Sequence, residues 1–99
     1  MSQPSTLVVT ATPNPEAMDS AQAYLQGSMP LLLAAGGKLV KRLNVTEVIH
    51  GNPRAMVLVM DFESDQVIKD LYESDEYTAL IPDRINGFAE MNILVTHEM

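Results

Sequence analysis

The chain has 99 residues, of which 46% are hydrophobic and 19% are charged, so it suits one globular domain and is too apolar for a disordered state. Thirteen acidic and six basic residues give a net charge of −7, which argues against nucleic acid and anionic membranes as partners because both select basic surfaces. Without cysteine, the chain forms no disulfide, no thiolate nucleophile and no Cys-ligated metal centre. We therefore expect a single domain over residues 1–99.

Neither a membrane span nor a secretory leader is expected. The longest apolar run, Ala55 to Met60, is far too short to cross a bilayer. The first residues lack a basic region followed by an apolar stretch, so we expect a cytoplasmic location.

The N-terminal third predicts a strand followed by a helix. Residues 6–11 are apolar and β-branched, which is typical of a strand buried on both faces. Asn14 suits the N-cap of the helix and Pro15 its first position. Pro30 has no amide proton, so we expect a break or kink there. The helix should stop at Gly36-Gly37.

The middle of the chain predicts a hairpin. Residues 38–49 have an extended pattern whose alternation fails near Asn44, where we expect a bend or bulge. His50-Gly51-Asn52-Pro53 predict a turn. The chain then returns as a strand over residues 54–62.

The C-terminal third predicts an interrupted helical segment and a last strand. Ser64 caps a first helix, Ser74 caps a short second one, Pro82 interrupts it and Gly87 ends it. Residues 88–97 close the chain as a strand. The resulting order, βαββαβ, predicts the α+β ferredoxin-like fold, an antiparallel sheet with helices on one face.

Two strands are apolar without alternation, at residues 7–9 and 55–60. Helices cover only one face of such a sheet, so the apolar side chains on the other face would be exposed to water unless another structure covers them. A second copy of the chain, packed sheet against sheet, is the simplest cover. The alternative is a half-exposed strand that tolerates several valines and methionines.

Three stretches resemble a known family, namely Leu33 to Val40, Val59 to Ser64, and Leu71 to Tyr77 followed by Ile81-Pro82-Asp83-Arg84. Over nearly its whole length the chain resembles the DUF1330 proteins, a branch of the dimeric α/β-barrel superfamily, although Leu71 stands where a tryptophan is usual. The resemblance implies a homodimer with a ferredoxin-like fold and no established activity. Wider relatives include cofactor-free monooxygenases, lactone isomerases and haem-degrading enzymes. The absence of tryptophan argues against the last of these.

Asp61 and Arg84 are the two charged residues considered for a catalytic or ligand-binding role. Asp61 ends an otherwise apolar strand, so it is either a general base with a raised pKa or a structural partner of Arg54, Lys38 or Arg42. Arg84 lies among acidic residues. It either clamps this segment or offers two donors to a carboxylate or enolate oxygen.

Ligand-binding candidates gather in the second helical segment. We predict that Tyr72, Tyr77 and Arg84, together with Ser74, whose cap redirects the chain between the two tyrosines, converge at the mouth of a helix–sheet cleft. No metal and no cofactor are expected, because the two histidines, His50 and His97, lie in different regions of the chain.

These observations favour a homodimer that binds a small, partly apolar organic molecule in the cleft, with or without cofactor-free acid–base or oxygenase-type chemistry. A non-enzymatic ligand-binding or regulatory module is the alternative, and a purely stabilising subunit is a third. An enclosed apolar cavity with at least two convergent polar groups would favour ligand binding, and a fully packed interior would favour the other two.

Overall fold

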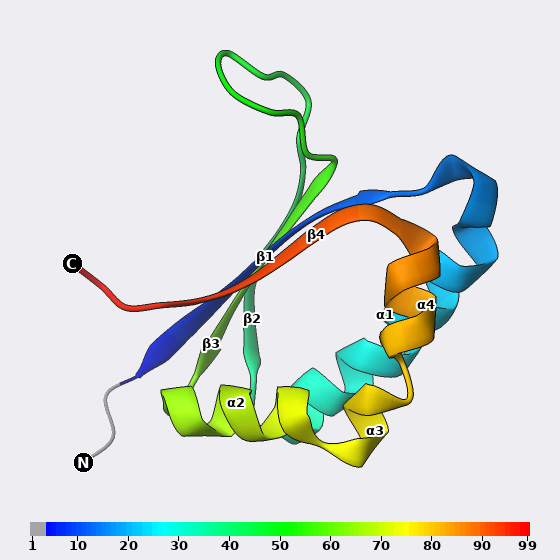
Figure 1. Cartoon of the computed structure of the whole chain (residues 1–99). Coiled ribbons are helices and arrows are strands. Elements are labelled where there is room, and N and C mark those ends of the chain that lie inside the picture. Colours follow the sequence, from blue (N-terminus) through cyan, green and yellow to red (C-terminus); the bar gives the residue numbers. More distant parts are fainter. Residues whose placement is uncertain (1–3) are drawn as a thin grey trace.

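The computed structural model describes residues 4–99, and Figure 1 shows how the helices and strands are arranged. In chain order the elements are β1 (Ser5–Pro13), the 3-10 turn η1 (Pro15–Ala17), α1 (Met18–Ala34), β2 (Lys38–Asn44), β3 (Met56–Phe62), α2 (Asp65–Glu73), α3 (Asp75–Thr78), α4 (Ile81–Gly87) and β4 (Phe88–Thr96). The predicted order is confirmed, and the second helical segment of the motif is divided into α2, α3 and α4.

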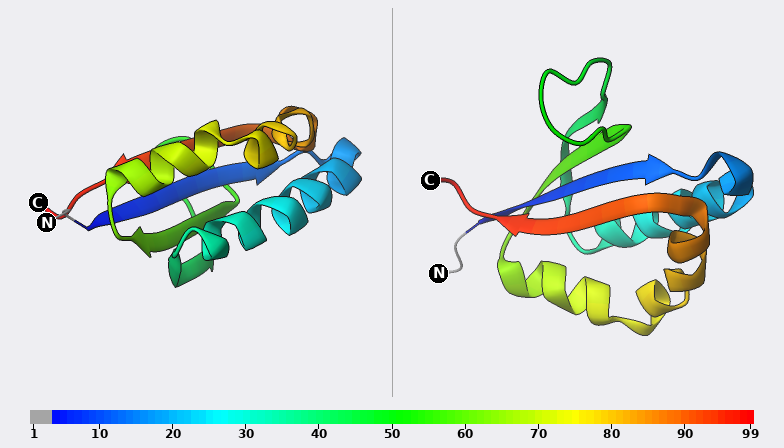
Figure 2. Two further views of the ribbon diagram at one scale, coloured as in Figure 1. Left: turned by 90° about the horizontal axis from the view of Figure 1, so that it is seen from below. Right: turned by 45° about the horizontal axis from the view of Figure 1, so that its top comes forward.

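The strands form one antiparallel sheet in the order β2-β3-β1-β4. The helices lie on one side of it, and seen from below α1 and α2 run in front of the strands (Figures 1 and 2). This arrangement confirms the predicted ferredoxin-like α+β fold.

The core lies between the helices and the sheet. Side chains alternate along each strand, so Leu7 of β1 and Met60 of β3, both fully buried, face the helices, where they pack with Ile68 of α2 and Leu32 of α1. A second buried cluster, which includes Tyr24, Tyr77 and Phe88, joins α1 to α3 and to the start of β4.

Helix α1 continues through Pro30 as one helix, so the predicted break is wrong. The missing amide costs a single backbone hydrogen bond, and packing of α1 against the sheet and α4 outweighs that cost. The predicted stop is confirmed. Gly36 has a φ of +89°, its N–H donates to Leu33 O, and the Gly37 N–H donates to Leu32 O, which is the hydrogen-bond pattern of a Schellman cap.

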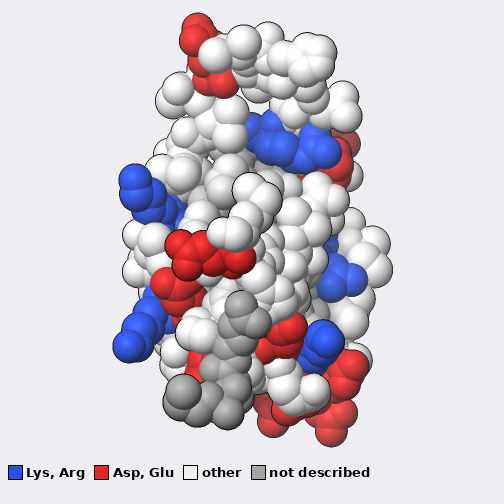
Figure 3. Space-filling model, turned by 90° about the vertical axis from the view of Figure 1, so that its left-hand side faces the viewer, with Lys and Arg blue, Asp and Glu red and all other residues white. Residues whose placement is uncertain are grey.

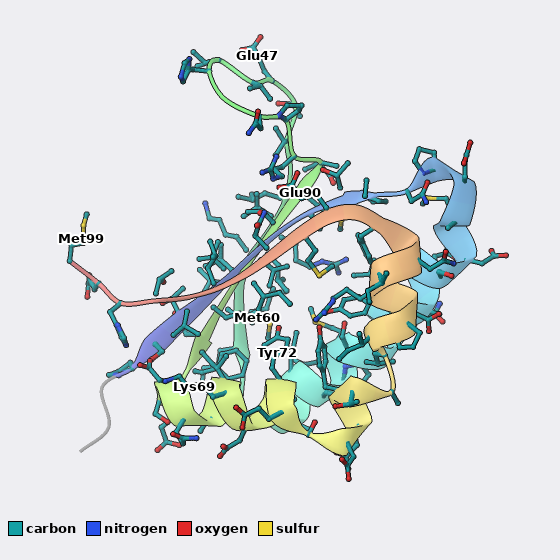
Figure 4. All side chains as sticks on the ribbon, viewed as in Figure 1. Glu47, Met60, Lys69, Tyr72, Glu90 and Met99 are labelled. Carbon is teal, nitrogen blue, oxygen red and sulfur yellow. The ribbon has the colours of Figure 1, made fainter. Side chains whose placement is uncertain are left out.

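The hairpin between β2 and β3 differs from the prediction at two points. β2 ends at Asn44 rather than at Ile49, and its irregularity lies between Leu39 and Lys41 rather than at Asn44. Residues 45–55 form a loop that projects from the body of the molecule, with Glu47 at its far end (Figures 1 and 4). Its large apolar residues, Val45, Val48 and Ile49, are all exposed, Ile49 by 94%, so they add nothing to the core.

The unbroken apolar runs divide between the two faces of the sheet. Leu7 and Met60 face the helices, whereas Val8 and Val59 face the other way. We call that second surface the helix-free face. At its centre Val59, Val8 and Leu94 lie side by side on β3, β1 and β4.

Candidate functional site

A cavity of about 540 Å³ lies between the helices and the sheet, with the edge strand β2 along one side. Its volume falls within the range of about 300–1,000 Å³ that is usual for small-molecule sites. The lining residues are mostly apolar and include Val9, Ala11, Met29, Leu32, Met56, Leu58 and Met91, together with the polar residues Tyr24, Gln26, Ser28, Arg42, Asn44 and Tyr72.

Regular secondary structure explains which residues reach the cavity. Along α1, Tyr24, Ser28 and Leu32 are spaced four apart, which places them on one face of the helix. Val9 of β1 and Leu58 of β3 are direct partners across the sheet and point toward the helices. Helix and strand periodicity therefore place these α1, β1 and β3 residues on the faces that line the cavity.

A network of phenol hydroxyls lies behind the inner wall of the cavity. The Tyr24 and Tyr77 hydroxyl oxygens are 2.7 Å apart, and Arg84 Nη1 donates a hydrogen bond of 2.9 Å to the Tyr77 hydroxyl. The Tyr72 ring packs edge-on against the Tyr77 ring, with centroids 4.6 Å apart.

Both tyrosines that line the cavity stay neutral. Burial, followed by interactions with the neighbouring tyrosines, raises the pKa of Tyr24 and that of Tyr72 above the usual value of a phenol. Their hydroxyl groups can therefore donate and accept hydrogen bonds, and they bring no negative charge to the cavity.

Three of the predicted ligand-binding residues lie close together, but only one lines the cavity. Tyr72 projects from α2 toward the sheet (Figure 4) and forms part of the cavity wall. Tyr77 is 2% exposed and lies behind it. Arg84 is joined to Tyr77 by the hydrogen bond described above.

Ser74 and Asp61 lie elsewhere. The Ser74 hydroxyl accepts a hydrogen bond from the Tyr77 backbone N–H at the start of α3, which is the capping role expected from the sequence. Asp61 is exposed on the helix-free face, where the Thr6 hydroxyl donates to it over 2.7 Å. Alternation with the buried Met60 could have located Asp61 on that face.

Arg42, Asn44 and Tyr24 line the cavity but are not among the ligand-binding residues predicted from the sequence. Tyr24 has a signal in the sequence, because it lies on the helix face that also carries Ser28. Arg42 has no such signal in the sequence, because the face on which its side chain lies depends on the irregular pairing of β2 with β3.

A second polar cluster joins the start of α2 to the start of β1 and the end of β4, which lie at the same end of the sheet. The Ser5 hydroxyl donates to Asp65 Oδ1, and His97 Nε2 lies 2.7 Å from the same oxygen and 3.3 Å from Ser5 Oγ. A catalytic triad needs the imidazole between serine and carboxylate, bound through its two different nitrogens. Here one nitrogen approaches both groups, so the cluster is a structural clamp.

Neither the charges on the face drawn in Figure 3 nor the metal-ligating side chains of residues 4–99 point to a further site. On the face shown in Figure 3, acidic and basic side chains are interspersed rather than gathered into one basic area. Within residues 4–99 no group of three or more His, Asp or Glu side chains could hold a metal ion. Over the same range no helix has the length and apolarity needed to cross a membrane.

Comparison with known proteins gives a family and a set of similar structures. A crystal structure of a protein of unknown function from Rhodopseudomonas palustris has a TM-score of 0.84 at 14% identity, covering 100% of this chain and 85% of that one. A dabb family protein with a ferredoxin-like fold from Mesorhizobium loti has a TM-score of 0.72 at 12% identity, covering 97% of each chain. A dimeric ferredoxin-like protein of unknown function from Thermobifida fusca has a TM-score of 0.64 at 9% identity, covering 99% of this chain and 93% of that one.

At these identities the likeness concerns the fold alone. No curated protein matches the chain. The model of the family described as domain of unknown function DUF1330 matches residues 6–99, which confirms the resemblance noted in the sequence. The chain belongs to the DUF1330 family.

Proposed function

We propose that this protein is a homodimer whose subunits each bind a small, partly apolar organic molecule in the helix–sheet cavity. The observation that carries the proposal is the cavity itself. It has the volume of a small-molecule site, its walls are mainly apolar, and several polar side chains converge on it. This is the combination expected of a ligand site and not of a core packed for stability alone.

Binding is favoured over acid–base catalysis by the chemistry of the cavity wall. The lining residues include no carboxylate and no imidazole, and the two tyrosines are neutral. A general base must lie within hydrogen-bond reach of the proton that it removes. Asp61, the base suggested by the sequence, lies on the opposite face of the sheet, so we do not include it in the proposed site.

The homodimer is supported by the helix-free face. Its apolar centre includes Val8, Val59 and Leu94, and a row of polar residues, Asp61, Thr6 and Thr96, borders it. An apolar centre with a polar rim is the usual composition of a protein interface. The protein from Thermobifida fusca, which has a similar fold, is described as dimeric.

Mass spectrometry of the native protein tests ligand binding. We expect a small molecule to be released on denaturation of the purified wild type. Leu58→Trp should abolish its retention, because the larger side chain fills the cavity. Ile85→Trp is the matched control, since Ile85 is 70% exposed on α4, and it should retain the molecule.

One combination of results would contradict the proposal. The wild type would release no small molecule, and its melting temperature would not rise with any member of a set of small aromatic and aliphatic acids, amides and alcohols. A ligand that binds the native state must raise that temperature.

A further inference from the structure

Arg42 is the single charged side chain in the wall of the cavity as described for residues 4–99. From this we propose that the ligand is a monocarboxylate with an apolar body, held through its carboxylate by Arg42. The inference rests on the proposed function and names the chemical class of the ligand.

An irregularity in the sheet brings Arg42 to the cavity. At the start of β2, Lys38 pairs with Asp61 and Leu39 with Met60, but Val40 has no partner and Lys41 pairs with Val59. This extra residue has the character of a β-bulge, which shifts the alternation of side chains by one position.

After the shift, Arg42 pairs with Leu58 and shares its helix-facing side, whereas Lys41 shares the helix-free face with Val59. With regular pairing the two basic residues would exchange faces. The bulge therefore gives the cavity a guanidinium in place of an ammonium. A guanidinium can bind both oxygens of a carboxylate at once.

The other arginines are engaged elsewhere. Arg54 forms an ion pair of 2.5 Å with Glu90, and Arg84 donates to the Tyr77 hydroxyl. Within the described residues no acidic side chain pairs with Arg42, and none lines the cavity. An anionic ligand would supply the missing charge partner.

Neutral polar groups accompany this charge. Asn44 lies two residues further along β2, pairs with Met56 and also lines the cavity, so its amide can donate to a second oxygen. The Tyr24 and Tyr72 hydroxyls stay protonated because burial raises their pKa, so they do not repel an anion. Opposite them, Val9, Leu58 and their apolar neighbours suit a hydrocarbon body.

Isothermal titration calorimetry with matched acid and amide pairs tests the inference. The probes are 2-naphthoate, 4-phenylbutyrate and decanoate, each compared with its neutral primary amide. We expect at least one acid to bind the wild type about tenfold or more tightly than its amide, a difference of about 1.4 kcal/mol. Arg42→Gln should remove this preference, because it weakens binding of the acid more than binding of the amide.

Lys41→Gln is the matched control, because it removes a positive charge from the neighbouring residue on the opposite face of the same strand. It should keep the preference for the acid. Circular dichroism would establish that all three proteins are folded, and Arg42 is an exposed residue of an edge strand, so its replacement should not unfold the chain.

The outcomes separate this inference from the proposed function. If acids and amides bind equally well, or if Lys41→Gln and Arg42→Gln weaken acid binding to the same extent, the carboxylate assignment is wrong and the ligand cavity stands. If none of the six compounds binds the folded wild type, the carboxylate assignment is wrong, and the mass spectrometry and melting experiments described above decide separately whether the cavity binds a ligand.

Discussion

The hydroxyl network shows how a single arginine acquires a structural role. Arg84 Nη1 donates to Tyr77, whose hydroxyl also contacts that of Tyr24, and the guanidinium carbon lies 5.8 Å from the centre of the Tyr77 ring. Arg84 thus contributes both a hydrogen bond and a cation–π contact. It supports the aromatic wall behind the cavity rather than lining the cavity itself.

The coupling between the two hydroxyls can be measured. Tyr77→Phe should reduce the free energy of unfolding by about 1–3 kcal/mol, because it leaves the buried Tyr24 hydroxyl without its partner. Tyr24→Phe should cost a similar amount. The double variant should cost less than the sum of the two, because it removes both polar groups together.

Urea unfolding of the four proteins at one protein concentration gives the required comparison. Strictly additive costs would show that the 2.7 Å contact between the hydroxyls contributes no free energy of its own.

The clamp around Asp65 makes stability depend on pH. The Ser5 hydroxyl, together with His97 and against the effect of burial, holds the pKa of the Asp65 carboxyl below its usual value of 3.8. Since the pKa is lower in the folded state, the stabilisation is fully present above pH 3.8. It is lost as the pH falls through the lower, folded-state pKa.

Ser5→Ala removes the main cause of this shift and Asp65→Asn removes the carboxyl. Both should reduce the fall in the free energy of unfolding that the wild type shows as the pH drops below 3.8, measured by urea unfolding across that range. If the free energy of unfolding falls with decreasing pH as steeply in both variants as in the wild type, this account is contradicted.

At the scale of elements, the approach of α4 to α1 depends on glycine. A Cβ built on Gly87 would lie 2.4 Å from the backbone nitrogen of Ala21 and 2.7 Å from its Cα. A Cβ on Gly27 would lie 2.5 Å from Leu80 Cδ2, the end of a flexible side chain. Backbone atoms cannot move aside as easily as the end of a side chain, so the two glycines should respond differently to substitution.

Gly87→Ala should reduce the free energy of unfolding by about 2–3 kcal/mol, because α4 must move away from α1 to relieve the overlap. Gly27→Ala should change it by less than about 1 kcal/mol, since Leu80 can move and alanine favours the helix. Chemical denaturation of both variants checks the contrast. Equal costs would show that the contact between these helices adapts freely.

At the scale of the whole molecule, the proposed dimer depends on the helix-free face. Leu94 is 48% exposed there. With its neighbours Val8 and Val59 it forms the apolar centre of this face. A second sheet packed on this centre would bury it, and more than about 1,000 Å² would be expected for a stable interface.

We expect light scattering at micromolar concentration to give about twice the chain mass of 10.9 kDa. Leu94→Glu should give the monomer mass, because it places a charge at the centre of the interface. Ile85→Glu is the control and should remain dimeric, since Ile85 lies on α4 and is 70% exposed. A wild type that stays monomeric at high concentration would refute this assembly.

The amino-acid sequence by itself determined the order of the elements and some of their ends. Asn14 and Ser74 cap the segments that follow them, and Gly36 ends α1 in the left-handed conformation that glycine favours. These features could be predicted because each depends on interactions within a few residues. The ferredoxin-like fold follows from their order together with alternation and helical spacing.

The tertiary structure alone decided which residues meet at the cavity. Whether Arg42 or Lys41 faces the helices depends on the pairing of β2 with β3 beyond Val40, and pairing register is a property of two strands. The partner of Arg84 is Tyr77 on a neighbouring helix, and α1 passes through Pro30 because packing outweighs one lost hydrogen bond. In each case the deciding free energy comes from contacts between elements, which local sequence patterns do not contain.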